Sequence, residues 1–474
     1  MTFKRIFLLF ALVTYTMSCA MADKGYRISV KVEGLPEGDV LLAYHFGDRQ
    51  YLQDTARMEQ PGLFVFEKED RLDPGMYLVV VPGQKFFEVI VDQNQHFDIT
   101  TRMDEFVEQT QFTNSPDNTA FYEYLRFIRN QSEQIGALRE ELATENLPDT
   151  RRQELSSQME IVDAAVKQRQ QEYTNLFPNG LFTRVLLAQQ EPEMSEAPIK
   201  EDGTTDQEAL YHLYKKKYWE NIDFSDDRLL RTPVYHNKLR TYFSNVVVQI
   251  PDSVIAEADR IVDLSRASHE VFKYTIWFIT NHFERSQIMG HDAVFVHMIE
   301  RYYMSGEAHW VEPENLKRIS ERAMKLKPLL LGKVAPDINM FKPDQGRLSL
   351  HEVNARYTIL YFWDSECSHC KRVTPELRTL AERLKPEGVE VFAVNTEAEA
   401  EDWLKAVESY RLNAWINVND PANRSGFREK YDLYATPMIF LLDKEKKIIA
   451  KRITVEQVDE IIFHDMQREA SSSY

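Results

Sequence analysis

Two cysteines separated by two residues, Cys367 and Cys370, are the side chains of this sequence best suited to chemistry. Such a pair can alternate between a dithiol and a disulfide, although the same spacing also occurs in half of a zinc site. Zinc needs four ligands, and neither a second CxxC nor an H-x3-H pair stands near this one. A purely structural disulfide is disfavoured because closing so short a loop restricts the unfolded chain very little. The spacing predicts a redox-active pair that uses no metal and no other cofactor.

The surroundings of the pair in the sequence assign a role to each sulfur. An apolar run at 357–363 has the composition of a buried strand, and a helical segment follows it to about residue 384. A thiolate at a helix start faces unpaired N–H groups and the positive end of the helix dipole, which lower its pKa. Cys367 is therefore the predicted nucleophile, and Cys370, one turn further on, is the resolving thiol. Ser368 and His369 stand between them, and His369 is a candidate donor to the Cys367 thiolate.

Strands and helices alternate around this motif from residue 332 to the end of the sequence. Strands are expected at 389–395, 438–442 and 446–452, and helices at 400–410 and 455–467. This alternation predicts an α/β domain over 332–474 with a central sheet flanked by helices. Since these elements make a complete core, the domain is expected to fold alone.

Two further domains are expected upstream. Residues 23–114 contain short alternating runs separated by Gly and Pro, which predicts an all-β, sandwich-like domain of about seven strands. Residues 115–331 change to a helical period, which predicts a mainly α-helical domain. Neither segment shows a catalytic constellation. Both are expected to bind, to dimerise or to position the redox domain.

The first residues have the pattern of an export signal. Lys4 and Arg5 precede an apolar stretch at 6–17, which is too short for a stable transmembrane helix. Cleavage after residue 22 is one expected outcome, and lipidation of Cys19 with cleavage before it is the other. The sequence thus predicts a protein of the periplasm or cell envelope, released or anchored by a lipid. A net charge of -18 argues against nucleic-acid partners.

The C-terminal region resembles the thioredoxin superfamily, and more closely its TlpA/ResA-like membrane-associated branch. The features that carry the resemblance are Phe362-Trp363, Cys367-Ser-His-Cys370, Pro375, Ala435-Thr436-Pro437, the opening Gly332-Lys-Val-Ala-Pro-Asp and the hairpin-like 339–350. The whole arrangement is similar to exported proteins and lipoproteins of Gram-negative gut bacteria, in which a β domain and a helical domain precede such a module. The resemblance implies a thiol-disulfide oxidoreductase of cell redox homeostasis. It implies protein thiols and disulfides as substrates, and an electron donor in the membrane or periplasm.

The resemblance also assigns roles around the sulfurs. Pro437 is the implied cis-proline facing them, and the backbone of Thr436 is implied to pair with a substrate strand. Thioredoxins carry a buried acid two residues before Trp363, where this sequence has Tyr361, so the usual proton acceptor is missing. Glu366 is the candidate replacement.

Two other functions remain open at this level. A peroxiredoxin-like peroxidase shares the fold, but it needs Thr or Ser three residues before its cysteine, where Asp364 stands here. The second is an envelope binding or scaffold protein that uses a thioredoxin-like module for partner recognition. Intact cysteines favour the enzyme.

Overall fold

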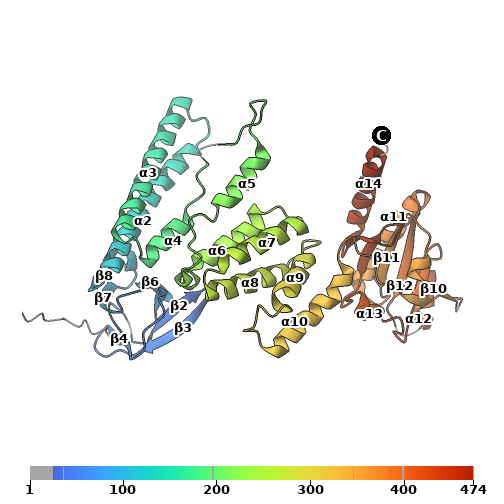
Figure 1. Ribbon diagram of the computed structural model, residues 1–474, viewed down its shortest axis with the longest axis horizontal. Coiled ribbons are helices and arrows are strands. Elements are labelled where there is room, and N and C mark those ends of the chain that lie inside the picture. Colours follow the sequence, from blue (N-terminus) through green and yellow to red (C-terminus); the bar gives the residue numbers. More distant parts are fainter. Residues whose placement is uncertain (1–24, 36, 195–196, 345, 398–399, 473–474) are drawn as a thin grey trace, which may run out of the picture. The chain divides into compact units, whose positions relative to one another are not determined.

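The structure is a computed structural model that describes residues 25–35, 37–194, 197–344, 346–397 and 400–472. The chain forms two compact units, Met1–Arg240 and Thr241–Tyr474 (Figure 1). The division falls inside the helical segment, whose first half belongs with the β domain and whose second half belongs with the redox domain. The predicted signal sequence and Cys19 lie outside the described residues. Within the described residues, no helix is both long and apolar enough to cross a membrane.

The N-terminal unit contains the predicted sandwich-like β domain, built from two four-stranded sheets. One sheet has the order β4-β1-β7-β8 and the other has the order β3-β2-β5-β6. Strand β1 shows the alternation that a half-buried strand requires, with Ile28 and Val30 buried while Arg27 and Lys31 are exposed. The strands are β1 (Tyr26–Glu33), β2 (Val40–Phe46), β3 (Arg49–Ala56), β4 (Leu63–Lys68), β5 (Gly75–Val81), β6 (Lys85–Val91), β7 (His96–Arg102) and β8 (Gln111–Thr113).

Helices follow the sheets in the same unit. Helices α2 and α3 lie side by side as a long hairpin (Figure 1). The helix α2 starts with Pro116, whose ring is compatible with the first turn. The helical elements are α1 (Phe106–Gln109), α2 (Pro116–Leu142), α3 (Asp149–Leu176), α4 (Leu181–Gln189), α5 (Gln207–Lys217), the 3-10 turn η1 (Asp227–Arg231) and α6 (Pro233–Thr241).

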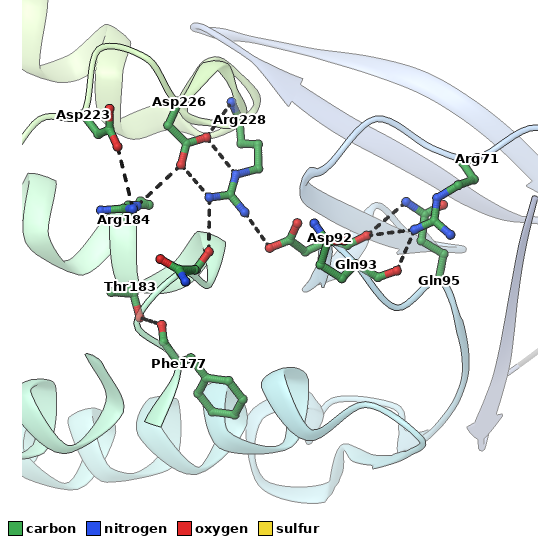
Figure 2. A network of polar contacts seen from close by, with 11 residues as sticks. Arg71, Asp92, Gln93, Gln95, Phe177, Thr183, Arg184, Asp223, Asp226 and Arg228 are labelled. Atoms are coloured by element: carbon green, nitrogen blue, oxygen red, sulfur yellow. Dashed lines mark hydrogen bonds and ion pairs between the residues drawn. The ribbon is translucent and has the colours of Figure 1, made fainter. Parts of the chain in front are cut away.

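A polar network ties the β sheets to these helices (Figure 2). Arg228 donates through Nη1 to Oδ2 of Asp92, which follows β6, at 2.8 Å. The same guanidinium binds both carboxylate oxygens of Asp226, at 2.7 and 2.5 Å. Arg184 of α4 lies 3.6 Å from Asp226, and it also approaches Asp223 at 3.7 Å. The side chains of Asp92 and Asp226 are less than 10% exposed. The positive charges of the two arginines therefore offset the desolvation cost of these carboxylates.

The C-terminal unit begins with helices. They are a π-helical turn η2 (Tyr242–Val246), α7 (Pro251–Ser265), α8 (His269–Glu284), α9 (Asp292–Met298), a second π-helical turn η3 (Ile299–Tyr303), α10 (Pro313–Leu326) and the 3-10 turn η4 (Lys327–Leu329). Ser268 begins α8 with its side chain accepting from the amide of Val271. Two buried contacts join this helical layer to the sheet that follows. Lys451 pairs with Asp292 and donates to the carbonyl of Leu329 at 2.6 Å.

The predicted α/β fold is confirmed in the rest of this unit. Its seven-stranded sheet has the order β10-β9-β13-β12-β11-β14-β15, in which β11, β12 and β13 are parallel. The elements are β9 (Asn339–Phe341), β10 (Arg347–Ser349), η5 (Leu350–Glu352), β11 (Tyr357–Trp363), α11 (Ser368–Leu384), η6 (Lys385–Glu387), β12 (Val389–Asn395), α12 (Ala400–Ser409), β13 (Ile416–Asn419), α13 (Phe427–Lys430), β14 (Met438–Leu442), β15 (Ile448–Lys451) and α14 (Val455–Ser472).

The two faces of the sheet carry separate cores. Tyr361 and Trp363 of β11 pack with residues of α11, α12 and α14, while Leu360 and Phe362 of the same strand face the other layer. That second core includes Leu329, which precedes the expected boundary at residue 332. The redox domain therefore draws part of its core from the helical segment. Strand β11 is buried on both faces, and it ends immediately before the residues that lead to the cysteines.

Candidate active site

Cys367 and Cys370 lie at the start of α11, as the sequence predicts. Cys367 is the N-cap residue, partly exposed, and Cys370 is completely buried in the first turn. Both are free thiols. The loop from Trp363 brings the chain from the centre of the sheet to the helix start. This puts one sulfur at the surface and the other beneath it.

The environment separates the acidities of the two sulfurs. Burial by itself raises the pKa of Cys367, but hydrogen bonds from the backbone amide and the thiol of Cys370, from the Thr436 side chain and from the amide of His369 together outweigh it. The pKa of Cys367 therefore lies below its ordinary value. Burial raises the pKa of Cys370 to about 12. Cys367 is thus the first to ionise, while Cys370 keeps its proton.

The segment before Pro437 faces the attacking sulfur. The Cys367 thiol donates to the carbonyl oxygen of Thr436 at 3.3 Å, and the Thr436–Pro437 peptide bond is cis. The structure thus brings together four of the residues predicted for the site, namely both cysteines, Thr436 and Pro437. Strand β14 begins at Met438, so Thr436 lies before the paired part of the sheet.

Tyr361 occupies the position of the missing acid. Its hydroxyl is hydrogen-bonded to Oγ1 of Thr374 at 2.9 Å, and burial raises its pKa well above the ordinary value. A phenol held in this state stays neutral and does not accept the proton of Cys370. Trp363 is fully buried and stacks on Tyr361, with 6.5 Å between the ring centroids. Trp363 belongs to the same buried cluster as Cys370, and Cys367 packs against that cluster.

The remaining predicted site residues point to solvent. Ser368 and His369 are exposed on the first turn of α11, and only the backbone N–H of His369 contacts the Cys367 sulfur. The carboxylate of Glu366 is 86% exposed and lies 3.6 Å from the ammonium of Lys371. In this structure Glu366 is placed as a solvated residue of the loop.

One residue that the sequence analysis did not single out holds the loop before the cysteines. Glu397, which follows β12, accepts hydrogen bonds from both the backbone amide and the hydroxyl of Ser365. Its own amide donates to Asn395 at 3.0 Å. These bonds fix the chain two residues before Cys367. A buried carboxylate of this kind has no local sequence pattern, so only the fold identifies it.

The residues around Cys367 bear on two other chemistries, zinc binding and peroxide reduction. Among the described residues, no group of three or more His, Cys, Asp or Glu side chains is arranged to hold a metal ion. Asp364, at the position where a peroxidase needs a hydroxyl, accepts a hydrogen bond from the amide of Glu366 at 2.8 Å. Its carboxylate organises the turn of the loop, and it supplies no donor to a peroxide.

A thioredoxin fold whose first helix begins at a CxxC motif defines a thiol-disulfide exchange protein. Residues 331–451 match the AhpC/TSA family, and residues 26–121 match a domain of unknown function, DUF4369. The chain is 25% identical over 132 residues to a "Thiol-disulfide oxidoreductase ResA" of Bacillus cereus, covering 27% of this chain and 75% of that protein. It is 33% identical over 93 residues to a "Thioredoxin-like protein" of Haemophilus influenzae, covering 19% of this chain and 50% of that protein.

A solved structure is also similar to part of this chain. It is a domain of a possible thiol-disulfide isomerase from Cytophaga hutchinsonii, with 42% identity and a TM-score of 0.29, covering 30% of this chain and 98% of that one. The C-terminal domain of the present chain therefore matches the AhpC/TSA family and is similar to thiol-disulfide oxidoreductases of the ResA type.

Proposed function

We propose that this protein reduces or isomerises disulfides of other proteins outside the cytoplasm through Cys367 and Cys370. The observation that carries the proposal is the place of two free thiols at the start of α11, with Cys367 partly exposed and Cys370 buried. Burial raises the pKa of Cys370, whereas amide donors lower that of Cys367. One sulfur is prepared to attack while the other is held back for the second step.

The reaction follows from these positions. The Cys367 thiolate attacks one sulfur of a substrate disulfide, forms a mixed disulfide, and releases the other substrate sulfur as a thiolate. Cys370 then loses its proton to that thiolate and attacks the Cys367 sulfur. This breaks the mixed disulfide and forms the Cys367–Cys370 disulfide. The substrate gains two electrons, which an electron donor in the membrane or periplasm must later return to the pair.

The proposed location rests on the sequence. The basic and apolar residues at 4–17 support export, and Cys19 offers a lipid attachment point at the envelope. Three domains, 23–114, 115–331 and 332–474, remain the proposed organisation, with the first two binding partners or positioning the third. The partners proposed for the third are envelope proteins that carry thiols or disulfides.

Trapping tests the proposal. The Cys370→Ala variant should accumulate mixed disulfides through Cys367, because the resolving step is lost. The double variant Cys367→Ser, Cys370→Ala is the matched control and should trap nothing. Cys367→Ser alone should lose exchange with insulin disulfides by at least about a thousandfold. If Cys370→Ala traps no more protein than the double variant, or if Cys367→Ser keeps its activity, the proposed function is wrong.

A further inference from the structure

Asp432, four residues before Thr436 in the chain, contacts the helical layer of the same unit. Asp432 accepts from Nη1 of Arg322 in α10 at 2.5 Å and from Nη2 of Arg452, after β15, at 3.0 Å. Only 13% of its side chain is exposed. Its φ of 48° lies in the left-handed region, where a non-glycine residue needs support from its surroundings. Two arginines from different elements therefore fix the backbone turn at Asp432.

Tyr434 follows two residues later, and its exposed ring contacts a guanidinium. It is 73% exposed, more than any other large hydrophobic side chain in the described part of the chain. The guanidinium carbon of Arg452 lies 5.2 Å from the centroid of its ring. The arginine that binds Asp432 therefore also covers one face of the tyrosine. An aromatic ring steadied in solvent loses little freedom when a ligand packs against it.

Tyr434 is close in the chain to the residue that contacts the attacking sulfur. Thr436, whose carbonyl accepts from the Cys367 thiol, is only two residues further along the chain. The Cα atoms of two residues this close in the chain lie at most roughly 7 Å apart. A peptide bound beside Thr436 with its disulfide at Cys367 would therefore bring a neighbouring side chain to the ring of Tyr434.

We propose that Tyr434 is a docking point for an apolar side chain of an extended substrate segment, and that Arg322 positions it from the helical layer. The proposal rests on the proposed function and names its substrate class, which is flexible polypeptide around a disulfide. Small disulfides reach Cys367 without contacting Tyr434. The helical layer at 241–331 then has a task in catalysis, because Arg322 fixes the turn at Asp432, two residues before Tyr434.

Two substrates test the proposal on the full chain. One is insulin, whose disulfides lie in a polypeptide, and the other is bis(2-hydroxyethyl) disulfide, which has nothing to offer Tyr434. Tyr434→Ala should raise KM for insulin roughly tenfold and leave the rate with the small disulfide within about twofold. Tyr434→Phe should retain the wild-type KM. Phe463→Ala, which removes an exposed aromatic ring from α14, is the control and should change neither rate.

The positioning role has its own variants. Arg322→Ala should raise KM for insulin roughly threefold without changing exchange with the small disulfide, and Arg322→Lys should recover most of the loss. Arg318→Ala removes an exposed arginine one turn earlier on α10 and should have no effect. An unchanged insulin KM in Tyr434→Ala, or an equal loss with both substrates, would overturn the docking site. Failure of the wild type with both substrates would instead remove the proposed function itself.

Discussion

The polar network of the N-terminal unit and the dithiol of the C-terminal unit both begin a helical segment, but they use that position in opposite ways. Asp226 precedes η1 and accepts from its backbone, and Arg228 of the same turn neutralises its charge. Cys367 precedes α11 and is stabilised by amides and a neighbouring thiol, with its sulfur partly exposed. A fixed counter-charge, as in the Asp226–Arg228 pair, occupies the carboxylate and stabilises the packing around it. Stabilisation by hydrogen-bond donors without a counter-ion leaves the partly exposed anion available to attack.

The largest expected effect comes from removing the arginine at the centre of the polar network in the N-terminal unit. Arg228→Ala leaves Asp92 and Asp226 buried without the guanidinium that binds both, so unfolding of the N-terminal unit should become easier by about 3–5 kcal/mol. Urea unfolding measures this change, and exchange by the dithiol in the absence of urea should stay at the wild-type rate.

An exposed pair in the same unit is the control. Arg102 and Glu33 are each about half exposed, and Arg102→Ala should change the free energy of unfolding by less than about 1 kcal/mol. If Arg228→Ala destabilises no more than Arg102→Ala, the buried network does not hold the unit together. If it also lowers exchange, the two regions are not independent.

The C-terminal unit also contains a largely buried ion pair, which allows the same test of a structural counter-charge there. Lys451 is buried beside Asp292, and burial lowers the pKa of Lys451 although Asp292 counteracts the effect. Asp292→Asn should cost about 3 kcal/mol in the free energy of unfolding, since it leaves a buried ammonium without its partner. Because the pKa of Lys451 is lower in the folded state than in the unfolded chain, stability should rise with pH as Lys451 deprotonates, up to about pH 10.4.

Unfolding at several pH values measures this behaviour. The matched control is Glu445→Gln, which breaks the exposed pair with Lys447 and should have little effect. A loss in Asp292→Asn that does not diminish at alkaline pH would show that the charge of Lys451 is not its cause.

Local patterns predicted the elements that carry the cysteines. The strand β11 is a continuous apolar run because both of its faces are buried, and the four-residue cysteine motif marks the next helix start. Strand β3 offers no such signal, since most of its residues are exposed and polar. Strand β13, only four residues long, was missed. Burial on both faces gives a signal in sequence that an exposed or very short strand lacks.

Residues that support the site from a distance escaped sequence analysis. Glu397 contacts a residue 32 positions away, and Arg322 contacts Asp432 across 110 positions. Single charged residues carry no periodicity or spacing that would mark them, so their role exists only in the folded chain. The same reason explains Leu329, which lies before the expected boundary and yet belongs to the core of the redox domain.

A smaller effect tests how the backbone tunes Cys367. Proline at position 369 removes the N–H that donates to the Cys367 sulfur, so His369→Pro should raise the pKa of Cys367. The thiolate fraction at neutral pH should fall roughly threefold to tenfold. A less stable Cys367 thiolate disfavours the reduced form, so the potential should become more reducing, toward the value of about -270 mV known for thioredoxin.

His369→Ala is the control because it removes the imidazole and keeps the N–H. Titration against glutathione redox buffers compares the three proteins. If His369→Ala shifts the potential as far as His369→Pro, the exposed imidazole and not the amide is the donor. Equal potentials in all three would remove position 369 from the tuning of Cys367.

The roles of Cys367 and Cys370 depend on the unequal acidity of their sulfurs. Alkylation of the reduced protein as a function of pH measures this difference. Mass spectrometry assigns the modification by iodoacetamide to each cysteine. Cys367 should reach half of its maximal rate below about pH 8.5, the ordinary value for a thiol. Cys370 should stay unmodified in the folded protein through neutral and mildly alkaline pH, since burial raises its pKa to about 12. Equal titration of both sulfurs, or earlier reaction of Cys370, would contradict the assignment of attacker and resolver.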